Sequence, residues 1–111
     1  MNDIREKDWK LARSIKERVL DLACERILEK ASKLIEGDDE GSHAKYLGLW
    51  SLIRKEDKQI GFMFNDFKRS GAMQQISLWK HHGLITDEEF SQFTPETRER
   101  IEGIGKMLET W

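Results

Sequence analysis

Residues 81–90 have the residue types of the second half of a calcium-binding loop. Gly83 stands where such a loop makes its sharp turn, and Glu89 stands at the position of its final ligand. The first half would begin at Leu78 and continue through Lys80, in positions where calcium needs oxygen ligands. A leucine and a lysine supply none. The residue types therefore argue against calcium binding here.

The same run satisfies a plainer rule for joining two helices. Thr86 and Glu89 have the spacing of a capping box, in which each side chain accepts a hydrogen bond from the other residue's amide, and Gly83 suits the end of the preceding helix. We therefore predict a short capped helix-turn-helix corner near residues 81–93. DNA reading is disfavoured, because the three acids at 87–89 would face phosphates with the wrong charge.

The histidines and the single cysteine form no pattern for metal binding or nucleophilic catalysis. His81 and His82 are adjacent, and neighbouring side chains of a helix point about 100° apart, so they do not easily share one ion. His43 is remote, and we predict no metal site and no cofactor. Cys24 lies within a helical pattern without a histidine nearby in the sequence, which favours a packed thiol over a catalytic one.

Asp57 is the ionisable residue whose neighbours in the sequence most suggest an apolar environment. Trp50 and Phe64 flank it at helical spacing, so Asp57 is expected on or near an apolar face. A buried carboxylate must be paired or hydrogen-bonded, or its pKa rises. We expect a structural pairing with Arg69, Arg54 or a tryptophan indole. The alternative is an enzyme that uses Asp57 with Arg69 in a pocket between helices.

Helices are the elements that must position these residues. With 38% hydrophobic residues, 36% charged residues and one proline, the composition favours amphipathic helices over sheets. Apolar spacing predicts helices at about residues 3–36, 43–58, 70–82, 87–92 and from Pro95 onward. A kink or break is expected near Gly61. The predicted fold is all-α, a compact bundle of four to five helices with a long N-terminal helix, in a single domain over residues 1–111.

The first predicted helix has an apolar face wider than one neighbouring helix needs. Its apolar stripe runs from Ala12 to Leu34, and Leu28 and Ile35 are among the residues that flank it. Several helices, or a second copy of the protein, are expected to pack there. The chain also has four tryptophans. Because tryptophan is enriched at interface hot spots, those near the chain ends are candidate anchors for a partner, with packing in the core as the preferred alternative.

The charges are unevenly distributed along the chain. The net charge is −2, so no overall positive field attracts nucleic acid, and a nucleic-acid partner is not expected. Residues 84–111 contain seven acids and three bases, whereas residues 59–83 contain three bases and one acid. The acidic residues from Asp87 to Glu109 suggest an alternative function, that of an antitoxin-like or immunity-like partner of a basic protein.

No apolar run approaches the roughly 18 residues that a membrane-spanning helix needs, and the first residues lack the apolar core of a signal peptide. One cysteine allows no disulfide within the chain, so nothing implies an oxidising compartment. A cytoplasmic location without a membrane partner is the expectation.

Several short motifs are spread along the chain: Asp8-Trp9-Lys10, Trp50 through Asp57-Lys58, Arg69-Ser70, and Gly83-Leu84-Ile85-Thr86 followed by Phe93. Together they resemble a group of small bacterial helical proteins of uncharacterised function. The resemblance covers most of the chain and implies a bacterial cytosolic domain, without implying an activity. Residues 83–90 alone also resemble short C-terminal helical hairpins that bacterial proteins use for oligomerisation, although here another helix follows.

The leading hypothesis is a non-enzymatic protein that binds another protein or a second copy of itself. A homodimer would form through the wide face of the first helix. The hypothesis rests on that face, on the tryptophan count and on the absence of paired catalytic groups. The candidate partner-binding or structural polar residues are Trp9, Trp50, Asp57, Arg69, Asp87, Glu88 and Trp111.

Overall fold

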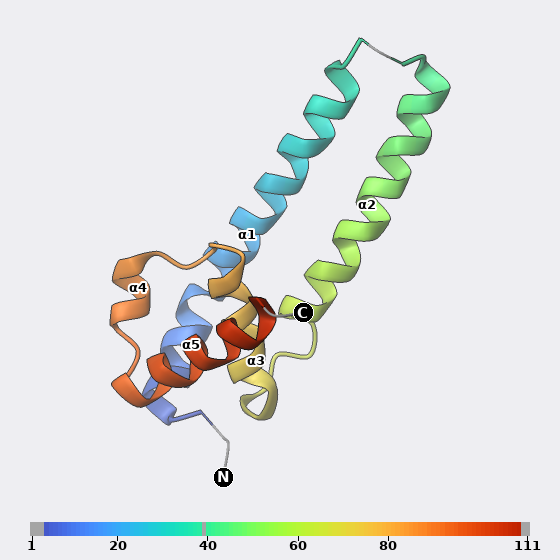
Figure 1. The fold of residues 1–111 in the computed structure, drawn as a ribbon. Coiled ribbons are helices and arrows are strands. Elements are labelled where there is room, and N and C mark those ends of the chain that lie inside the picture. The colour runs from blue at the N-terminus through green and yellow to red at the C-terminus, as the bar shows by residue number, and fades with distance from the viewer. Residues whose placement is uncertain (1–3, 39, 110–111) are drawn as a thin grey trace.

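The chain folds into α-helices joined by short turns. The computed structural model describes residues 4–38 and 40–109 (Figure 1). Its helices are α1 (Glu6–Glu36), α2 (Ser42–Phe64), α3 (Arg69–His81), α4 (Asp87–Ser91) and α5 (Pro95–Glu109). These two ranges contain no strand, which confirms the predicted all-α fold with its long first helix. No helix within them has both the length and the apolar character needed to cross a membrane.

α1 and α2 form a long antiparallel hairpin whose far end extends away from the other helices (Figure 1). The molecule measures 53 × 28 × 24 Å as a result. α1 is continuous over 31 residues because neither proline nor glycine interrupts it. It ends at Gly37, whose amide donates to the Lys33 carbonyl at 3.1 Å.

α2 continues through Gly61, so the predicted break near that residue was wrong. The helix runs to Phe64, and the Asn65 amide still donates to the Gly61 carbonyl at 3.0 Å. A glycine inside a helix costs about 1 kcal/mol relative to alanine. Met63 and Phe64 are both buried, and burial of each such side chain contributes about 1.5–3 kcal/mol. Packing at the end of α2 therefore outweighs the cost of the glycine.

The helices α3, α4 and α5 gather around the N-terminal half of α1 (Figure 1), and we call this part of the molecule the head. α3 contacts α1, α2 and α5, so it lies at the centre of the head. The largest fully buried apolar side chains are Trp79, Phe93, Ile76, Ile101 and Val19. The core therefore lies at one end of the molecule, and the far half of the hairpin has little to pack against.

Asp8 of α1 is a fully buried residue that joins α1 to the start of α5. Its Oδ1 accepts a hydrogen bond from the Thr94 amide at 2.9 Å, and its Oδ2 accepts from the hydroxyls of Thr94 at 2.7 Å and Thr97 at 2.6 Å. The predicted start of α5 is confirmed, because Pro95 is its first residue and the Thr97 amide donates to Thr94 Oγ1 at 3.4 Å. One carboxyl group thus ties the two helix ends together.

The corner between α3 and α4 forms as predicted. The Glu89 amide donates to Thr86 Oγ1 at 3.0 Å and the Thr86 amide donates to Glu89 Oε1 at 2.9 Å, which completes the capping box. Gly83 has a φ of 69°, in the left-handed region that favours glycine. Arg18 of α1 donates to the Glu89 carboxylate and, at 2.9 Å, to the Leu84 carbonyl. These contacts fix the corner to α1.

Replacing Glu89 by alanine is expected to lower the free energy of unfolding by about 1–2 kcal/mol, because the variant loses both a helix cap and the ion pair with Arg18. Partial burial acts to raise the pKa of Glu89, but hydrogen bonds from Thr86 and the contact with Arg18 outweigh it and hold the pKa below its ordinary value of 4.5. A carboxylate with a lowered pKa contributes stability above its unfolded pKa, and that contribution is lost as the pH falls through the folded pKa.

Urea unfolding at a series of pH values tests this expectation. The stability difference between the wild type and Glu89→Ala should be constant near neutral pH and should shrink as the pH falls below 4.5. Glu88→Ala is the matched control, since it removes one exposed acid from the same helical turn. A difference that stays constant into the acid range would contradict the assigned role of Glu89.

Candidate functional site

Seven large apolar side chains of the α1–α2 hairpin are exposed, and besides Leu47 and Phe62 of α2 there are five that we consider together. They are Leu28 (66% exposed) and Ile35 (53%) of α1, and Tyr46 (68%), Trp50 (60%) and Ile53 (40%) of α2. A single exposed apolar residue is ordinary, whereas a contiguous exposed patch marks a binding surface. Whether these five side chains form one patch depends on how the two helices pack.

The contacts between α1 and α2 define the seam of the hairpin. Lys30 Nζ donates to Glu56 Oε1 at 3.1 Å across this seam. Farther from the head, a Cβ atom added to Gly48 would lie 3.3 Å from Leu34 Cδ1. The absence of a side chain at Gly48 therefore allows α2 to approach α1 closely near the far end of the hairpin.

Leu28, Ile35, Tyr46, Trp50 and Ile53 lie on one side of that seam. Tyr46, Trp50 and Ile53 follow one another at steps of four and three, and Leu28 and Ile35 lie two turns apart. Successive residues of a helix are rotated by about 100° around its axis. Counted from the seam in the direction of increasing residue number, the exposed residues of α1 and those of α2 are each rotated by roughly a quarter turn or somewhat more. Because α1 and α2 run antiparallel, equal rotations bring both sets to the same side of the hairpin.

The two sets also lie at matching heights along the hairpin. Lys45 Nζ donates to the Ile35 carbonyl at 3.0 Å, which sets Ile35 beside the first turns of α2 and so near Tyr46. The ion pair across the seam sets Leu28 near Ile53 in the same way. The exposed residues therefore form one patch across both helices. We call it the hairpin face, and it consists of Leu28, Ile35, Tyr46, Trp50 and Ile53.

The tryptophans predicted as candidate partner-binding residues lie in different environments. Trp50 belongs to the hairpin face. Trp9 is half-buried in the head, where the centroid of its ring lies 4.9 Å from that of Phe67 and the Arg13 guanidinium lies 5.5 Å from the ring. Trp9 therefore packs within the chain, as the preferred alternative expected. Trp111 lies outside the described residues.

The expected pairing of Asp57 was wrong. Asp57 is exposed, and Arg69 instead forms an ion pair with Glu6 of α1. The error has a clear origin, because Trp50 was taken to mark a buried face and is itself 60% exposed. Of the five main clefts lined by described residues, none is lined by Asp57 or by Arg69. The structure therefore does not bring together the two residues of the suggested catalytic pocket.

Asp8 is the buried acid that the sequence reasoning missed. The buried residues of α1 fall at positions 8, 12, 15, 19, 23 and 31, so Asp8 continues the apolar stripe by one turn toward the N-terminus. Its position on this stripe could have indicated from the sequence that Asp8 is buried. With its carboxyl group enclosed by Thr94 and Thr97, Asp8 has a structural role and offers no open site.

The acidic corner and the histidines lie in the head. Asp87 and Glu88 are exposed in the first turn of α4. The rings of His81 and His82 meet edge to face with centroids 5.4 Å apart. Within residues 4–38 and 40–109, no group of three or more histidine, cysteine, aspartate or glutamate residues could hold a metal ion.

A cleft of about 380 Å³ lies between α1, α2 and the α3–α4 corner. Arg26, Lys30 and His82 line it, but Arg26 donates to the His82 carbonyl at 2.6 Å and Lys30 is paired across the seam. Burial and the neighbouring His81 lower the pKa of His82 below its ordinary value of 6.5. Arg26 therefore holds α1 against the α3–α4 corner, whereas Lys30 holds α1 against α2.

Comparisons of the chain with protein-family models, with curated proteins and with solved structures found no match. The hairpin face is therefore interpreted from its own geometry.

Proposed function

We propose that the protein is a binding module that recognises a protein partner through the hairpin face. The observation that carries this proposal is a continuous exposed apolar patch spread over two helices that are held together by their own seam. Large exposed patches are rare on soluble monomers and are typical of interaction sites. Trp50, which lies between Tyr46 and Ile53 along α2 and is 60% exposed, belongs to a residue type enriched at interface hot spots.

Binding is favoured over catalysis for two reasons. The acid and the base considered for a catalytic pocket lie apart, with Asp57 in water and Arg69 paired to Glu6. The hairpin face offers apolar area and no converging polar groups, which suits a partner's apolar surface more than a small polar substrate. Bacterial origin and a cytoplasmic location stay predictions from the sequence.

Photocrosslinking tests the proposed surface directly. A photoreactive phenylalanine analogue at position 50 is expected to form a discrete protein adduct, because the partner would cover that side chain. The same analogue at position 62 is the matched control, since Phe62 is also on α2 and 67% exposed but points to the other side of the seam. Equal adducts at both positions, or none at position 50, would contradict the proposal.

The variant Trp50→Ser should weaken the association by about tenfold or more, as expected when a hot-spot residue is removed. Its free energy of unfolding should stay within about 0.5 kcal/mol of the wild type, because the side chain makes few contacts within the chain.

A further inference from the structure

We propose that the partner of the hairpin face is a basic amphipathic helix of another protein, an inference that rests on the function proposed above. Such a helix would lay its apolar side on the hairpin face and would set lysines or arginines against two acids that border the face near the head. Docking the apolar side of a helix onto an apolar surface is a common mode of peptide recognition.

The two acids are Asp21 of α1 and Asp57 of α2, and we call them the acidic end. Asp57 follows Trp50 by seven residues, which is close to two full turns, so it lies on the same side of α2. Asp21 precedes Leu28 by seven residues and lies on the same side of α1 in the same way. Both acids are exposed, and neither forms an ion pair within residues 4–38 and 40–109. Their charge is therefore available to a partner.

The bases of the hairpin lie elsewhere. Eight lysines and arginines occur between residues 18 and 58. Lys30 and Lys45 stay in the seam, where Glu56 Oε1 and the Ile35 carbonyl accept from them. Counted around each helix from the seam, the others lie opposite the seam or on the far side of the hairpin: Arg18, Arg26, Lys33, Arg54, Lys55 and Lys58. The side that carries the hairpin face thus combines apolar area with negative charge.

The apolar residues and the acids follow one another along the hairpin. α2 runs toward the head, so Asp57 lies nearer to the head than the apolar residues of α2 that belong to the face. α1 runs away from the head, so Asp21 lies two turns nearer to it than Leu28. The ion pair across the seam sets Asp57 within about one turn of the height of Leu28. A bound helix would therefore meet apolar side chains along most of its length and acids at one end.

The length of this surface fits a short helix. Residues 21–35 of α1 span about 21 Å at about 1.5 Å per residue, which is roughly four helical turns. The helix dipole favours bases near the C-terminal end of a helix. We therefore expect the partner helix to have its apolar residues first and its bases in its last turns, and to run parallel to α2.

Charge distinguishes this partner from two others. A second copy joined face to face would bring only acids to the acidic end, because its own face carries no base. Nucleic acids and anionic lipids present phosphates, which Asp21 and Asp57 repel. A basic amphipathic helix supplies both an apolar side and the opposite charge.

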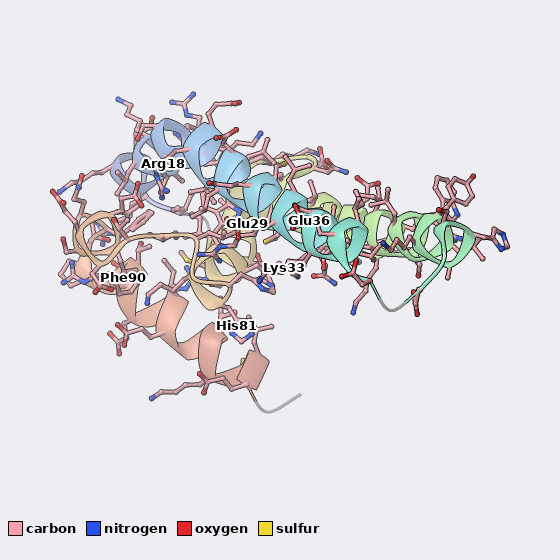
Figure 2. The ribbon with its side chains drawn as sticks, turned by 90° about the horizontal axis from the view of Figure 1, so that it is seen from above. Arg18, Glu29, Lys33, Glu36, His81 and Phe90 are labelled. Atoms are coloured by element: carbon pink, nitrogen blue, oxygen red, sulfur yellow. The ribbon has the colours of Figure 1, made fainter. Side chains whose placement is uncertain are left out.

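The head leaves room for such a helix. Figure 2 shows α3 and α5 displaced to one side of the hairpin. The exposed fractions of the five apolar side chains place the hairpin face on a side that the head does not cover. A partner helix can therefore lie along the hairpin without displacing an element of the chain.

Binding of synthetic peptides to the full chain tests the charge of the partner. The probe is a dye-labelled, alanine-rich helix of about 18 residues. It carries leucines at steps of three and four in its first half and lysines at the same steps in its second half. In fluorescence anisotropy it should bind about tenfold or more tightly than the same peptide with glutamate in place of lysine. Asp21→Lys/Asp57→Lys should reverse this preference, because the acidic end then carries bases.

Asp87→Lys/Glu88→Lys is the matched control, because it reverses two exposed acids in the head and should leave the preference for lysine unchanged. Trp50→Ser should weaken the binding of both peptides by removing apolar area that they share. A lysine peptide that does not bind, or that binds no better than the glutamate peptide, would overturn the basic-helix proposal.

Two further outcomes separate this inference from the binding function itself. If the lysine peptide binds and Trp50→Ser leaves its affinity unchanged, the hairpin face is not the binding surface and both proposals fail. If the wild type sediments as a dimer and Trp50→Ser as a monomer, the partner is a second copy. The basic-helix proposal then fails while the hairpin face remains a binding surface.

Discussion

Replacing Asp8 by alanine is expected to lower the free energy of unfolding by about 3–5 kcal/mol, a large share of the 5–15 kcal/mol typical of a domain. The carboxyl group of Asp8 is completely buried and accepts three hydrogen bonds. Its removal leaves the Thr94 amide and the hydroxyls of Thr94 and Thr97 without their acceptor. Unpaired buried donors cost about 1–3 kcal/mol each, and the vacated space adds to the loss.

The measurement is urea unfolding followed by circular dichroism. Asp57→Ala is the matched control, since it removes an exposed carboxylate and should change stability by less than about 0.5 kcal/mol. Thr97→Val in both backgrounds completes a double-mutant cycle. The two changes should be non-additive, because both remove the same 2.6 Å hydrogen bond. Equal effects of the two aspartate variants would contradict the structural role of Asp8.

Local rules allowed much of the helical arrangement to be predicted from the sequence. α1 was expected from about residue 3 to 36 and spans Glu6–Glu36, because its apolar spacing is regular and Gly37 follows. The capping box at Thr86 and the start of α5 at Pro95 were predicted for the same reason. Each depends on contacts within four residues, so the types of a few neighbouring residues decide them.

The hairpin face could not be recognised in this way. Tyr46, Trp50, Ile53 and Phe64 all belong to one apolar side of α2, and periodicity alone treats them alike. Phe64 is 5% exposed because the head covers it, whereas the other three are exposed because the hairpin extends beyond the head. Whether an apolar stripe is core or interface depends on which helices reach it, and that is a property of the tertiary structure.

For Asp57 and Asp8, too, burial depends on the tertiary structure. Asp57 was expected on or near an apolar face because Trp50 and Phe64 flank it, but Asp57 is exposed, as Trp50 is, and only Phe64 is buried. Asp8 continues a stripe that is buried, and its partners Thr94 and Thr97 are more than 80 residues away in the sequence. The stripe indicated the burial, but no local pattern linked the acid to its hydrogen-bond donors.

Trp79 is the second position at which a large loss of stability is expected. It is completely buried in α3, and its Nε1 donates to the Met63 carbonyl in the last turn of α2 at 2.9 Å. Its ring lies between two others, with centroid distances of 5.6 Å to Phe64 and 5.3 Å to Phe67. This side chain therefore joins α3 to the base of the hairpin by packing and by a hydrogen bond.

Trp79→Ala is expected to lower the free energy of unfolding by about 3–5 kcal/mol, the range for removing a large core aromatic. Trp79→Phe keeps most of the ring packing but leaves the Met63 carbonyl without its donor, so a loss of about 2–3 kcal/mol is expected. The Phe variant keeps the test decisive if the Ala variant does not fold.

Trp50→Phe is the matched control and should be neutral within about 0.5 kcal/mol, since Trp50 is 60% exposed. Circular dichroism during urea unfolding makes the comparison without relying on tryptophan fluorescence. Similar losses at positions 50 and 79 would mean that the base and the far half of the hairpin are equally packed, contrary to the division between head and hairpin face.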